Sequence, residues 1–445
     1  MMRGMSTDAT AAGRPNAIAR LMGLERHEYT AVAWSFLYFF CLLSAYYVLR
    51  PMREAMAVAS GPDTIPYLFT GTFVTMTLAT PVFGWIASKY PRRVFLPWVY
   101  AFFIANILLF WAVFSYAIAN DIDYVWMSRV FFVWVSVFNL YVVAVFWSFM
   151  ADIYSRDQGR RLFGMITSGG SIGALIGGIA TSILVGPLGF ENLLLVSAAL
   201  LLLAVYCIGR LRHWYEVEHQ GEAGDNITSH KPLGGSPLNG IKAVFSSKYF
   251  AAMAISTVIA SLLGTALYMF AAELVEEAIT DVDGRTRFFS NMNNAINALA
   301  IIGQLFIVKH VVARFGVGVS LSLLPILSVV GFAVLALEPT LMVVAVLTVI
   351  RRALGFGFSK PTSDMLYSVV TPEEKYKAKN FIDTTIYRGG DLIATWTIRG
   401  MSALGIAGTS LAILPFALIW TFAAFWLGRD YRRRDRLATA AENQT

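Results

Sequence analysis

Arginines embedded in apolar sequence are the residues of this chain best suited to bind a ligand. Arg50 and Arg53 follow the apolar run 31–49 on the expected outer side of the membrane, and they share one face if the helix continues past that run. Glu54 is available as an internal counter-ion. Because guanidinium groups bind phosphate and carboxylate through paired hydrogen bonds and stay charged, the spacing predicts an anion-binding pair. Side chains that only reach toward a membrane interface are the alternative.

Charged residues recur in the last quarter of the chain, within and beside two further apolar runs. Charges that could act on a ligand lie within or beside the runs 341–358 and 381–404: Arg351, Arg352, Lys360, Asp364, Asp383, Arg388 and Asp391. Asp391 lies three residues after Arg388, so a local ion pair is available. More cations than anions around one cavity would favour an anionic substrate. A salt-bridge lock between two parts of the protein is the alternative.

Amide side chains mark one face of the apolar run 288–308. Asn291, Asn294, Asn297 and Gln304 are spaced by three, three and seven residues, which places them along one side of a helix. That side lines either a water-filled cavity or a polar seam between helices. We therefore predict a substrate-binding set of Arg50, Arg53, Arg351, Lys360, Arg388, Asn294 and Asn297. A second set is predicted to gate the cavity or pair charges: Glu54, Asp364, Asp383, Asp391, Arg92 and Arg93.

The composition indicates the solvent in which these residues are positioned. Of 445 residues, 57% are hydrophobic and only 14% are charged, whereas soluble domains carry about 25% charged residues. The apolar residues form runs of about 20, the length that crosses roughly 30 Å of hydrocarbon as a helix. The sequence therefore predicts an all-α integral membrane protein with twelve transmembrane helices. Its net charge of +7 is attributed to membrane topology rather than to a nucleic-acid partner.

The predicted spans form two groups of six on either side of a long polar stretch. The expected parts are a tail (1–30), a first half (31–209), a linker (210–249), a second half (250–427) and a C-terminal tail (428–445). Lys and Arg gather in alternate loops and at the chain ends, so both termini are expected to be cytoplasmic. A Gly-Gly pair at Gly169 recurs at Gly389, 220 residues later. Two parallel six-helix halves are the organisation of major-facilitator transporters.

Two short motifs bear on function. The segment 84–93 resembles the major-facilitator loop signature and ends in the basic pair Arg92–Arg93, although Ser88 stands where an acid is usual and Pro91 where a glycine is usual. An ordinary basic loop is the alternative. The Gly-x-Ser-x-Gly sequence at 169–173 matches a hydrolase motif, but it lies in an apolar helix and is interpreted as helix packing. We predict no enzyme activity, no cofactor, no catalytic residue and no metal site; the two cysteines are too few for a disulfide scaffold.

Several segments resemble the nucleotide transporters known as the ATP/ADP translocases of plastids and obligate intracellular bacteria. The similar segments are 49–58, 64–68, 145–152, 361–367 and 375–383. The resemblance implies exchange of nucleotides without ATP hydrolysis, with Arg53 in place of a basic residue at the end of the first helix. Two departures alter the charge of the implied pocket: no acid occurs at 135–138, and Asp391 stands where the family has a lysine. These departures leave open a divergent branch whose substrate is not ATP.

The expected function is therefore secondary-active transport of an anion by alternating access. A nucleoside phosphate or related phosphorylated metabolite, carried in exchange by an antiporter, is the first interpretation. A transporter or flippase of another anionic or amphiphilic substrate, such as a lipid or organic anion, is the second, and a non-transporting scaffold is the third. The protein is expected to be a monomer in the bacterial inner membrane, with membrane lipid and the anionic substrate as its partners.

Overall fold

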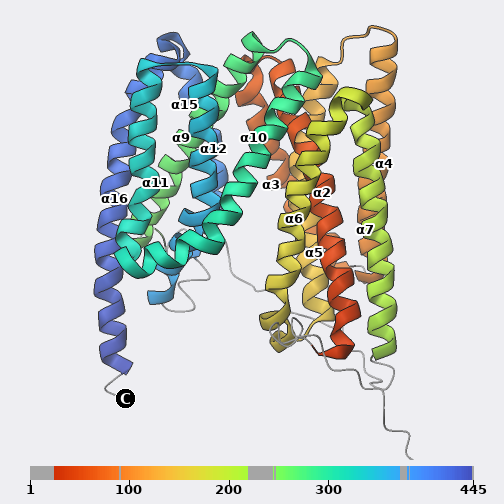
Figure 1. Cartoon of the computed structure of the whole chain (residues 1–445), viewed down its shortest axis with the longest axis horizontal. Coiled ribbons are helices and arrows are strands. Elements are labelled where there is room, and N and C mark those ends of the chain that lie inside the picture. Colours follow the sequence, from red (N-terminus) through yellow and green to blue (C-terminus); the bar gives the residue numbers. More distant parts are fainter. Residues whose placement is uncertain are drawn as a thin grey trace, which may run out of the picture.

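Two bundles of long helices stand side by side in the computed structural model (Figure 1). The structure describes residues 25–89, 92–218, 244, 247–370, 378–379 and 381–442, and no strand occurs among them. The first bundle contains six helices: α2 (Tyr29–Ala59), α3 (Ile65–Lys89), α4 (Arg92–Ala119), α5 (Val125–Ile153), α6 (Arg156–Leu188) and α7 (Phe190–Glu218). Short 3-10 turns, η1 (Arg26–Glu28) and η2 (Pro62–Thr64), precede α2 and α3.

The second bundle also crosses six times, but with more interruptions. Its elements are α9 (Lys248–Ala278), α10 (Val282–Ile302), η3 (Gly303–Ile307), α11 (Val308–Leu337), α12 (Leu341–Leu354), η4 (Gly355–Ser359), α13 (Lys360–Met365), η5 (Leu366–Val369), η6 (Ile382–Ile386), α15 (Tyr387–Gly400), η7 (Ser402–Leu404) and α16 (Gly405–Glu442). Three of these, η3, η4 and η6, are π-helical. Single π-turns inside α-helices are frequent at functional sites. Here η4 directly precedes Lys360, and η6 contains Asp383.

Twelve crossings follow from the order of the helices. Nine helices of the described residues are long and apolar enough to cross a membrane by composition alone. The remaining crossings are made by α3, α10 and α15. Each of them connects a helix that ends on one side of the protein to a helix that begins on the other side (Figure 1). A polar face explains why α10 and α15 are less apolar than their neighbours. The prediction of an all-α fold with two six-helix halves is confirmed.

Several element ends differ from the sequence prediction. Helix α2 does not stop near residue 49; it continues through Pro51 to Ala59, so Arg50 and Arg53 lie inside a buried helix rather than at its exposed end. A proline removes only one backbone hydrogen bond, and packing of the neighbouring buried residues holds the helix together. Helix α7 reaches Glu218, and α16 reaches Glu442 inside the predicted C-terminal tail. Most of the predicted linker and of the N-terminal tail lies outside the described residues.

Glycines of the fifth helix of each half allow close packing on the first helix of that half. A Cβ atom at Gly169 would lie 2.6 Å from the Phe36 carbonyl oxygen of α2, and Gly170 meets Phe39. In the second half, a Cβ atom at Gly390 of α15 would lie 3.2 Å from the Cβ atom of Ser261 on α9. The Gly-Gly pairs found in the sequence therefore lie on corresponding helices, as small-residue packing requires.

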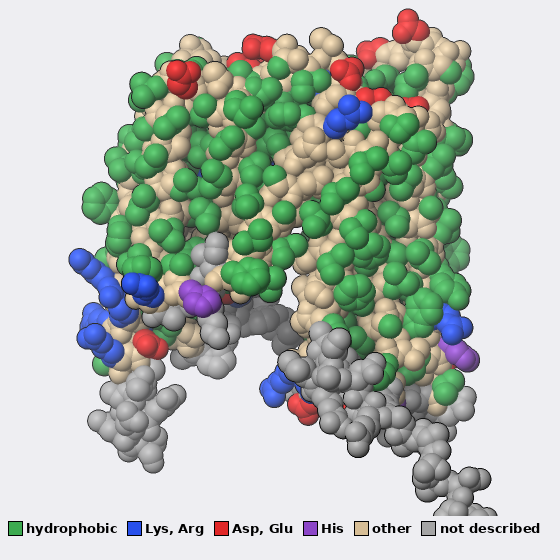
Figure 2. Space-filling view, viewed as in Figure 1, with side chains coloured by type: hydrophobic (Ala, Val, Ile, Leu, Met, Phe, Trp, Pro, Cys, Tyr) green, Lys and Arg blue, Asp and Glu red, His purple; other side chains and the backbone are tan. Residues whose placement is uncertain are grey.

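The two bundles touch at one end and separate at the other, leaving a hollow between them (Figures 1 and 2). Helix α10 packs against α2 and α6 of the first half, and α15 packs against α3. Acidic side chains gather at the closed end, here called the acidic end. Basic side chains, including those of the lower part of α16, gather at the open end, here called the basic end (Figure 2). In this view the hollow opens toward the basic end (Figure 2).

Candidate functional site

Helix α2 contributes two arginines to the centre of the molecule. Arg53 donates from Nη1 to Ser136 Oγ of α5 at 3.0 Å and from Nη2 to Glu54 Oε1 at 2.9 Å. Its guanidinium also lies over the Phe132 ring, 4.6 Å from the ring centroid. Arg50 donates to the Tyr47 hydroxyl at 3.1 Å. The helix therefore carries two guanidiniums and one carboxylate on neighbouring turns.

The Arg53–Glu54 pair is well shielded from water. Only 18% of the Arg53 side chain and 5% of the Glu54 side chain are exposed. Arg53 Nε is buried without a hydrogen-bond partner among the described residues, and Glu54 has only the Tyr268 hydroxyl of α9 as a further neighbour. Buried polar atoms without a partner are uncommon in folded proteins and mark a strained or ligand-ready place. This pair is therefore only partly satisfied by the protein itself.

The second half contributes Arg352 rather than Arg351 to the same region. Arg351 points into its own half, where it donates from Nη2 to the Ala260 carbonyl oxygen at 2.5 Å and lies near the Trp420 ring. Arg352, by contrast, lies within electrostatic range of Arg50 and Glu54. Two adjacent arginines on a helix point in different directions, because successive side chains are about 100° apart. Sequence alone did not indicate which of the two faces the first half.

Arg388 of α15 lies in the same neighbourhood. Asp391 is within electrostatic range of both Arg388 and Arg352, and it contacts the Ser261 hydroxyl of α9 through a hydrogen bond. The local Arg388–Asp391 ion pair that the spacing made available is not formed. We call Arg50, Arg53, Arg352 and Arg388 the central arginine cluster.

Helix geometry places three arginines of the cluster at similar depth. At about 1.5 Å per residue, Arg50 lies about 14 Å from the acidic end of α2, and Arg352 lies about 16 Å from the acidic end of α12. Arg388 lies about 18 Å from the acidic end of α15 by the same reckoning. Arg50, Arg352 and Arg388 therefore lie at similar depth, with Arg53 about 5 Å nearer the acidic end. A guanidinium at this depth is expensive without an anion or water.

Few carboxylates balance this charge. Glu54 is engaged by Arg53, and Asp391 is engaged by Ser261. In the part of the chain that the structure describes, no carboxylate lies within ion-pairing distance of Arg50, Arg352 or Arg388. The cluster thus carries a net positive charge that the described protein does not neutralise.

The predicted asparagines lie where α10 meets the first half. Asn297 Oδ1 accepts a hydrogen bond from the Tyr47 hydroxyl at 3.3 Å, which extends the chain of contacts from Arg50 across to the second half. Asn294 instead packs its amide against Gly178 of α6, and its Oδ1 atom is buried without a hydrogen-bond partner among the described residues. Asn297 therefore belongs with the cluster, and Asn294 with the closed interface between the halves.

Lys360, Asp364 and Asp383 lie elsewhere, toward the basic end of the second half. Lys360 Nζ is 2.9 Å from Asp383 Oδ2 and 3.4 Å from Asp364 Oδ1, and Lys379 Nζ is 2.7 Å from Asp364 Oδ1. Lys360 lies about 28 Å along its span from the acidic end, roughly 12 Å beyond Arg352. We call these four residues the basic-end network. They join the tenth and eleventh spans of one half and are separate from the central arginine cluster.

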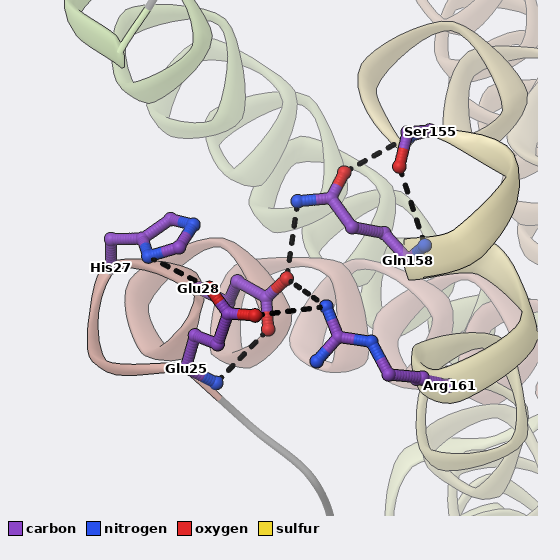
Figure 3. Close-up of polar contacts among 6 residues, drawn as sticks. All are labelled: Glu25, His27, Glu28, Ser155, Gln158 and Arg161. Atoms are coloured by element: carbon purple, nitrogen blue, oxygen red, sulfur yellow. Dashed lines mark hydrogen bonds and ion pairs between the residues drawn. The ribbon is translucent and has the colours of Figure 1, made fainter.

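A second polar cluster at the basic end joins α2 to α6, and sequence reasoning overlooked it (Figure 3). The Glu28 carboxylate is completely buried and accepts from Arg161 at 2.8 Å and from Gln158 at 3.1 Å. Ser155 and Gln158 cap the start of α6 reciprocally, and the Ser-x-x-Gln spacing is the sequence signal that could have found this cap. Because its oxygens are already engaged, Glu28 is structural. The side chains of Arg92 and Arg93, at the start of α4, lie outside the described residues.

Glu25, His27 and Glu28 place their potential ligand atoms within 4.8 Å of one another. Both Glu28 oxygens already accept hydrogen bonds, one from Arg161 and Gln158 and the other from the Glu25 backbone amide. A guanidinium therefore stands where a cation would have to bind, and this group does not fit a metal.

Two six-helix halves around a hollow that is open at one end, with unneutralised charge at mid-depth, define a membrane transporter that works by alternating access. The sequence profile of the Major Facilitator Superfamily matches residues 35–395, and the chain belongs to that superfamily.

Solved transporter structures share the fold at low sequence identity. A point mutant of the nucleoside transporter NupG aligns with a TM-score of 0.56 and 15% identity, covering 92% of this chain and 100% of its own. A bacterial homologue of the iron transporter ferroportin, in an inward-facing state, aligns with a TM-score of 0.61 and 12% identity, covering 91% of this chain and 98% of its own. A bacterial homologue of the human lysosomal transporter Spinster, inward-facing and unoccupied, aligns with a TM-score of 0.55 and 13% identity, covering 92% of this chain and 98% of its own. No curated protein sequence gives a significant match to this chain.

Proposed function

We propose that this transporter exchanges anions across the bacterial inner membrane, with a nucleoside phosphate or a related phosphorylated metabolite as its substrate. The observation that carries the proposal is the unbalanced charge of the central arginine cluster. A phosphate group accepts several charge-assisted hydrogen bonds at once, and Arg50 and Arg352 approach it from opposite halves. Such a ligand would engage both halves together, as alternating access requires.

The charge distribution supports an orientation with the basic end in the cytoplasm. Lys and Arg are retained on the cytoplasmic side of membrane proteins, and four arginines of α16 lie exposed at the basic end, whereas Asp63, Glu191 and Glu338 lie at the other. In this orientation both ends of the chain are cytoplasmic. The hollow then opens inward, and the interface at the acidic end closes the site to the outside.

The same charge argument favours exchange over one-way transport. If the empty protein closed over the cluster, it would enclose several guanidiniums without anions, at a cost of at least about 2.5–3.5 kcal/mol for each one kept from water. A bound anion removes that cost in either direction of movement. An anion would therefore have to occupy the site on both the outward and the return step, which is antiport.

The segments 361–367 and 375–383 resemble those of ATP/ADP translocases, and this resemblance favours a nucleotide among the phosphorylated candidates. Part of the second segment lies outside the described residues. Asp391 adds a carboxylate within range of Arg388 and Arg352. Because that carboxylate reduces the positive charge available to a ligand, a substrate with fewer phosphates than ATP fits the cluster better.

The test is exchange in proteoliposomes loaded with unlabelled nucleotides or phosphorylated metabolites and supplied with the labelled compound outside. Arg352→Gln should reduce exchange by roughly 30-fold or more, because removing a buried charged partner costs about 2–5 kcal/mol. Arg129→Gln, which removes an arginine of α5 that lies over the exposed Trp126 ring, is the matched control and should retain most activity. Wild-type exchange by Arg352→Gln would exclude the cluster as the binding site.

The assay also separates the remaining functions. Movement of labelled lipid between leaflets without exchange of any phosphorylated solute would identify a flippase. Absence of both activities in protein that melts cooperatively would favour a scaffold.

A further inference from the structure

The last helix extends well beyond the membrane and changes character along its exposed face. Helix α16 has 38 residues, about 57 Å, whereas the hydrocarbon layer requires only about 20 residues. Phe422, Phe425 and Trp426 are exposed on its outer face, with Phe422 75% exposed. Tryptophan is enriched where hydrocarbon meets headgroups. The residues that follow Trp426 are therefore at headgroup level.

Four arginines follow on the same face of α16. Arg429, Arg432, Arg433 and Arg436 are spaced by three, one and three residues, so they continue the stripe begun by the aromatic residues. Together with Leu437 they line one open recess of about 500 Å³. Helix α16 stands at the outer edge of the second half, away from the hollow between the halves (Figure 1). This face is separate from the central arginine cluster.

Asp430, the acidic residue next to Arg429, does not neutralise these arginines. Asp430 is turned toward the protein, where it pairs with Arg434 at 2.8 Å, and Arg434 lies over the Tyr249 ring. Among the described residues, none of the four outward arginines makes an ion pair or hydrogen bond. Helix α16 therefore turns the Asp430–Arg434 pair toward the protein and its four other arginines outward.

We propose that this face of α16 binds the headgroups of anionic phospholipids. The chemistry is that of a phosphodiester: it presents acceptor oxygens and a negative charge at the depth where Arg429 and Arg432 lie, while its acyl chains continue along Phe422 and Phe425. Clusters of four to eight basic residues next to a transmembrane helix attract anionic lipids. The proposal does not depend on the identity of the transported substrate.

The test uses purified full-length protein in a neutral detergent, with phosphatidylglycerol and phosphatidylcholine as probes and native mass spectrometry to count retained lipids. The wild type should retain phosphatidylglycerol in preference to phosphatidylcholine. Arg432→Gln should weaken that preference roughly fivefold, and replacing all four outward arginines by glutamine should abolish it. Arg434→Gln removes the same charge two residues further along, from the inward pair with Asp430. This variant should leave the preference near that of the wild type.

Three outcomes would overturn the proposal. Equal effects of Arg432→Gln and Arg434→Gln would show that only net charge matters and that no face is selected. Unchanged retention by the fourfold variant would place the lipid elsewhere. Displacement of phosphatidylglycerol by inorganic phosphate, but not by chloride at the same ionic strength, would assign the recess to a free anion. Replacement of the four arginines by lysine should preserve the preference, because the attraction is one of charge at a surface.

Discussion

The central arginine cluster and the basic-end network differ in how far their positive charges are balanced by carboxylates. In the network, two lysines face two aspartates, and the described contacts give each of the four side chains an opposite charge within 4 Å. In the cluster, four guanidiniums meet two carboxylates, and only Arg53 has an ion-pair partner among the described residues. The network is also more exposed, with 51% of the Lys360 side chain accessible.

This difference indicates which charges serve structure and which await a ligand. A balanced, exposed network needs nothing further and contributes modestly to stability. An unbalanced group at mid-depth is unfavourable by itself and becomes favourable when an anion arrives. The protein has enough acidic residues to neutralise the cluster, yet it places them at the acidic end and in the network. The following experiments alter the balance in each region.

The largest effect is expected from Arg53→Ala. The substitution leaves the Glu54 carboxylate buried without its partner, and breaking a buried pair in this way costs about 3–5 kcal/mol of stability. Thermal unfolding in detergent measures the loss. The double variant Arg53→Ala with Glu54→Gln should recover much of the stability while exchange stays low. A single variant as stable as the wild type would mean that the pair does not hold α2 in place.

An intermediate effect is expected when a carboxylate is added to the cluster. Asn297→Asp keeps the shape of the side chain and places a negative charge next to the Tyr47 hydroxyl, which already contacts Arg50. Hydrogen bonds to charged groups contribute roughly 1.5–3 kcal/mol, so the melting temperature should rise while anion exchange falls at least about tenfold.

Asn291→Asp is the matched control for this variant. Asn291 lies on the same helix, where its side chain accepts a hydrogen bond from Ser182, and the new charge should leave exchange nearly unchanged. If Asn297→Asp exchanged anions as well as the wild type, the excess positive charge would not be what binds the substrate.

The smallest effect is expected in the basic-end network. Lys360→Met should cost about 0.2–1 kcal/mol, as exposed ion pairs do, and exchange should stay within about twofold because Lys379 still pairs with Asp364. The swap of Lys360 to Asp with Asp383 to Lys should restore stability. Loss of exchange by Lys360→Met at unchanged melting temperature would show that Lys360 contacts the substrate, as the sequence alone had suggested.

The sequence predicted the crossings well because hydrocarbon imposes a simple rule. A run of about 20 apolar residues must form a helix, since every backbone amide and carbonyl has to be satisfied within the segment. The repeat of Gly169–Gly170 at Gly389–Gly390 also placed the fifth and eleventh spans correctly, because small residues are needed wherever two helix backbones approach closely. The end of α2 was predicted too early, because two arginines and a proline after an apolar run usually mark the end of a transmembrane helix.

The site was predicted in its residue types but not in its grouping. Arg50, Arg53, Arg388 and Asn297 lie in one region, whereas Lys360, Asp364 and Asp383 form a separate network. Arg352 was overlooked in favour of its neighbour Arg351, whose guanidinium bonds to Ala260 in its own half. Hydropathy reports that a charge is unusual, but it does not report the direction in which that charge points.

The sequence by itself therefore determined the number of crossings, the division into halves and the presence of excess positive charge at membrane depth. Each of these follows from local composition and the solvent. Only the tertiary structure decided which charges lie together and in which direction each one points, because packing brings together helices that are far apart in the chain. Arg50 and Arg352 are 302 positions apart in the chain, and only the packing of the two bundles brings them within electrostatic range.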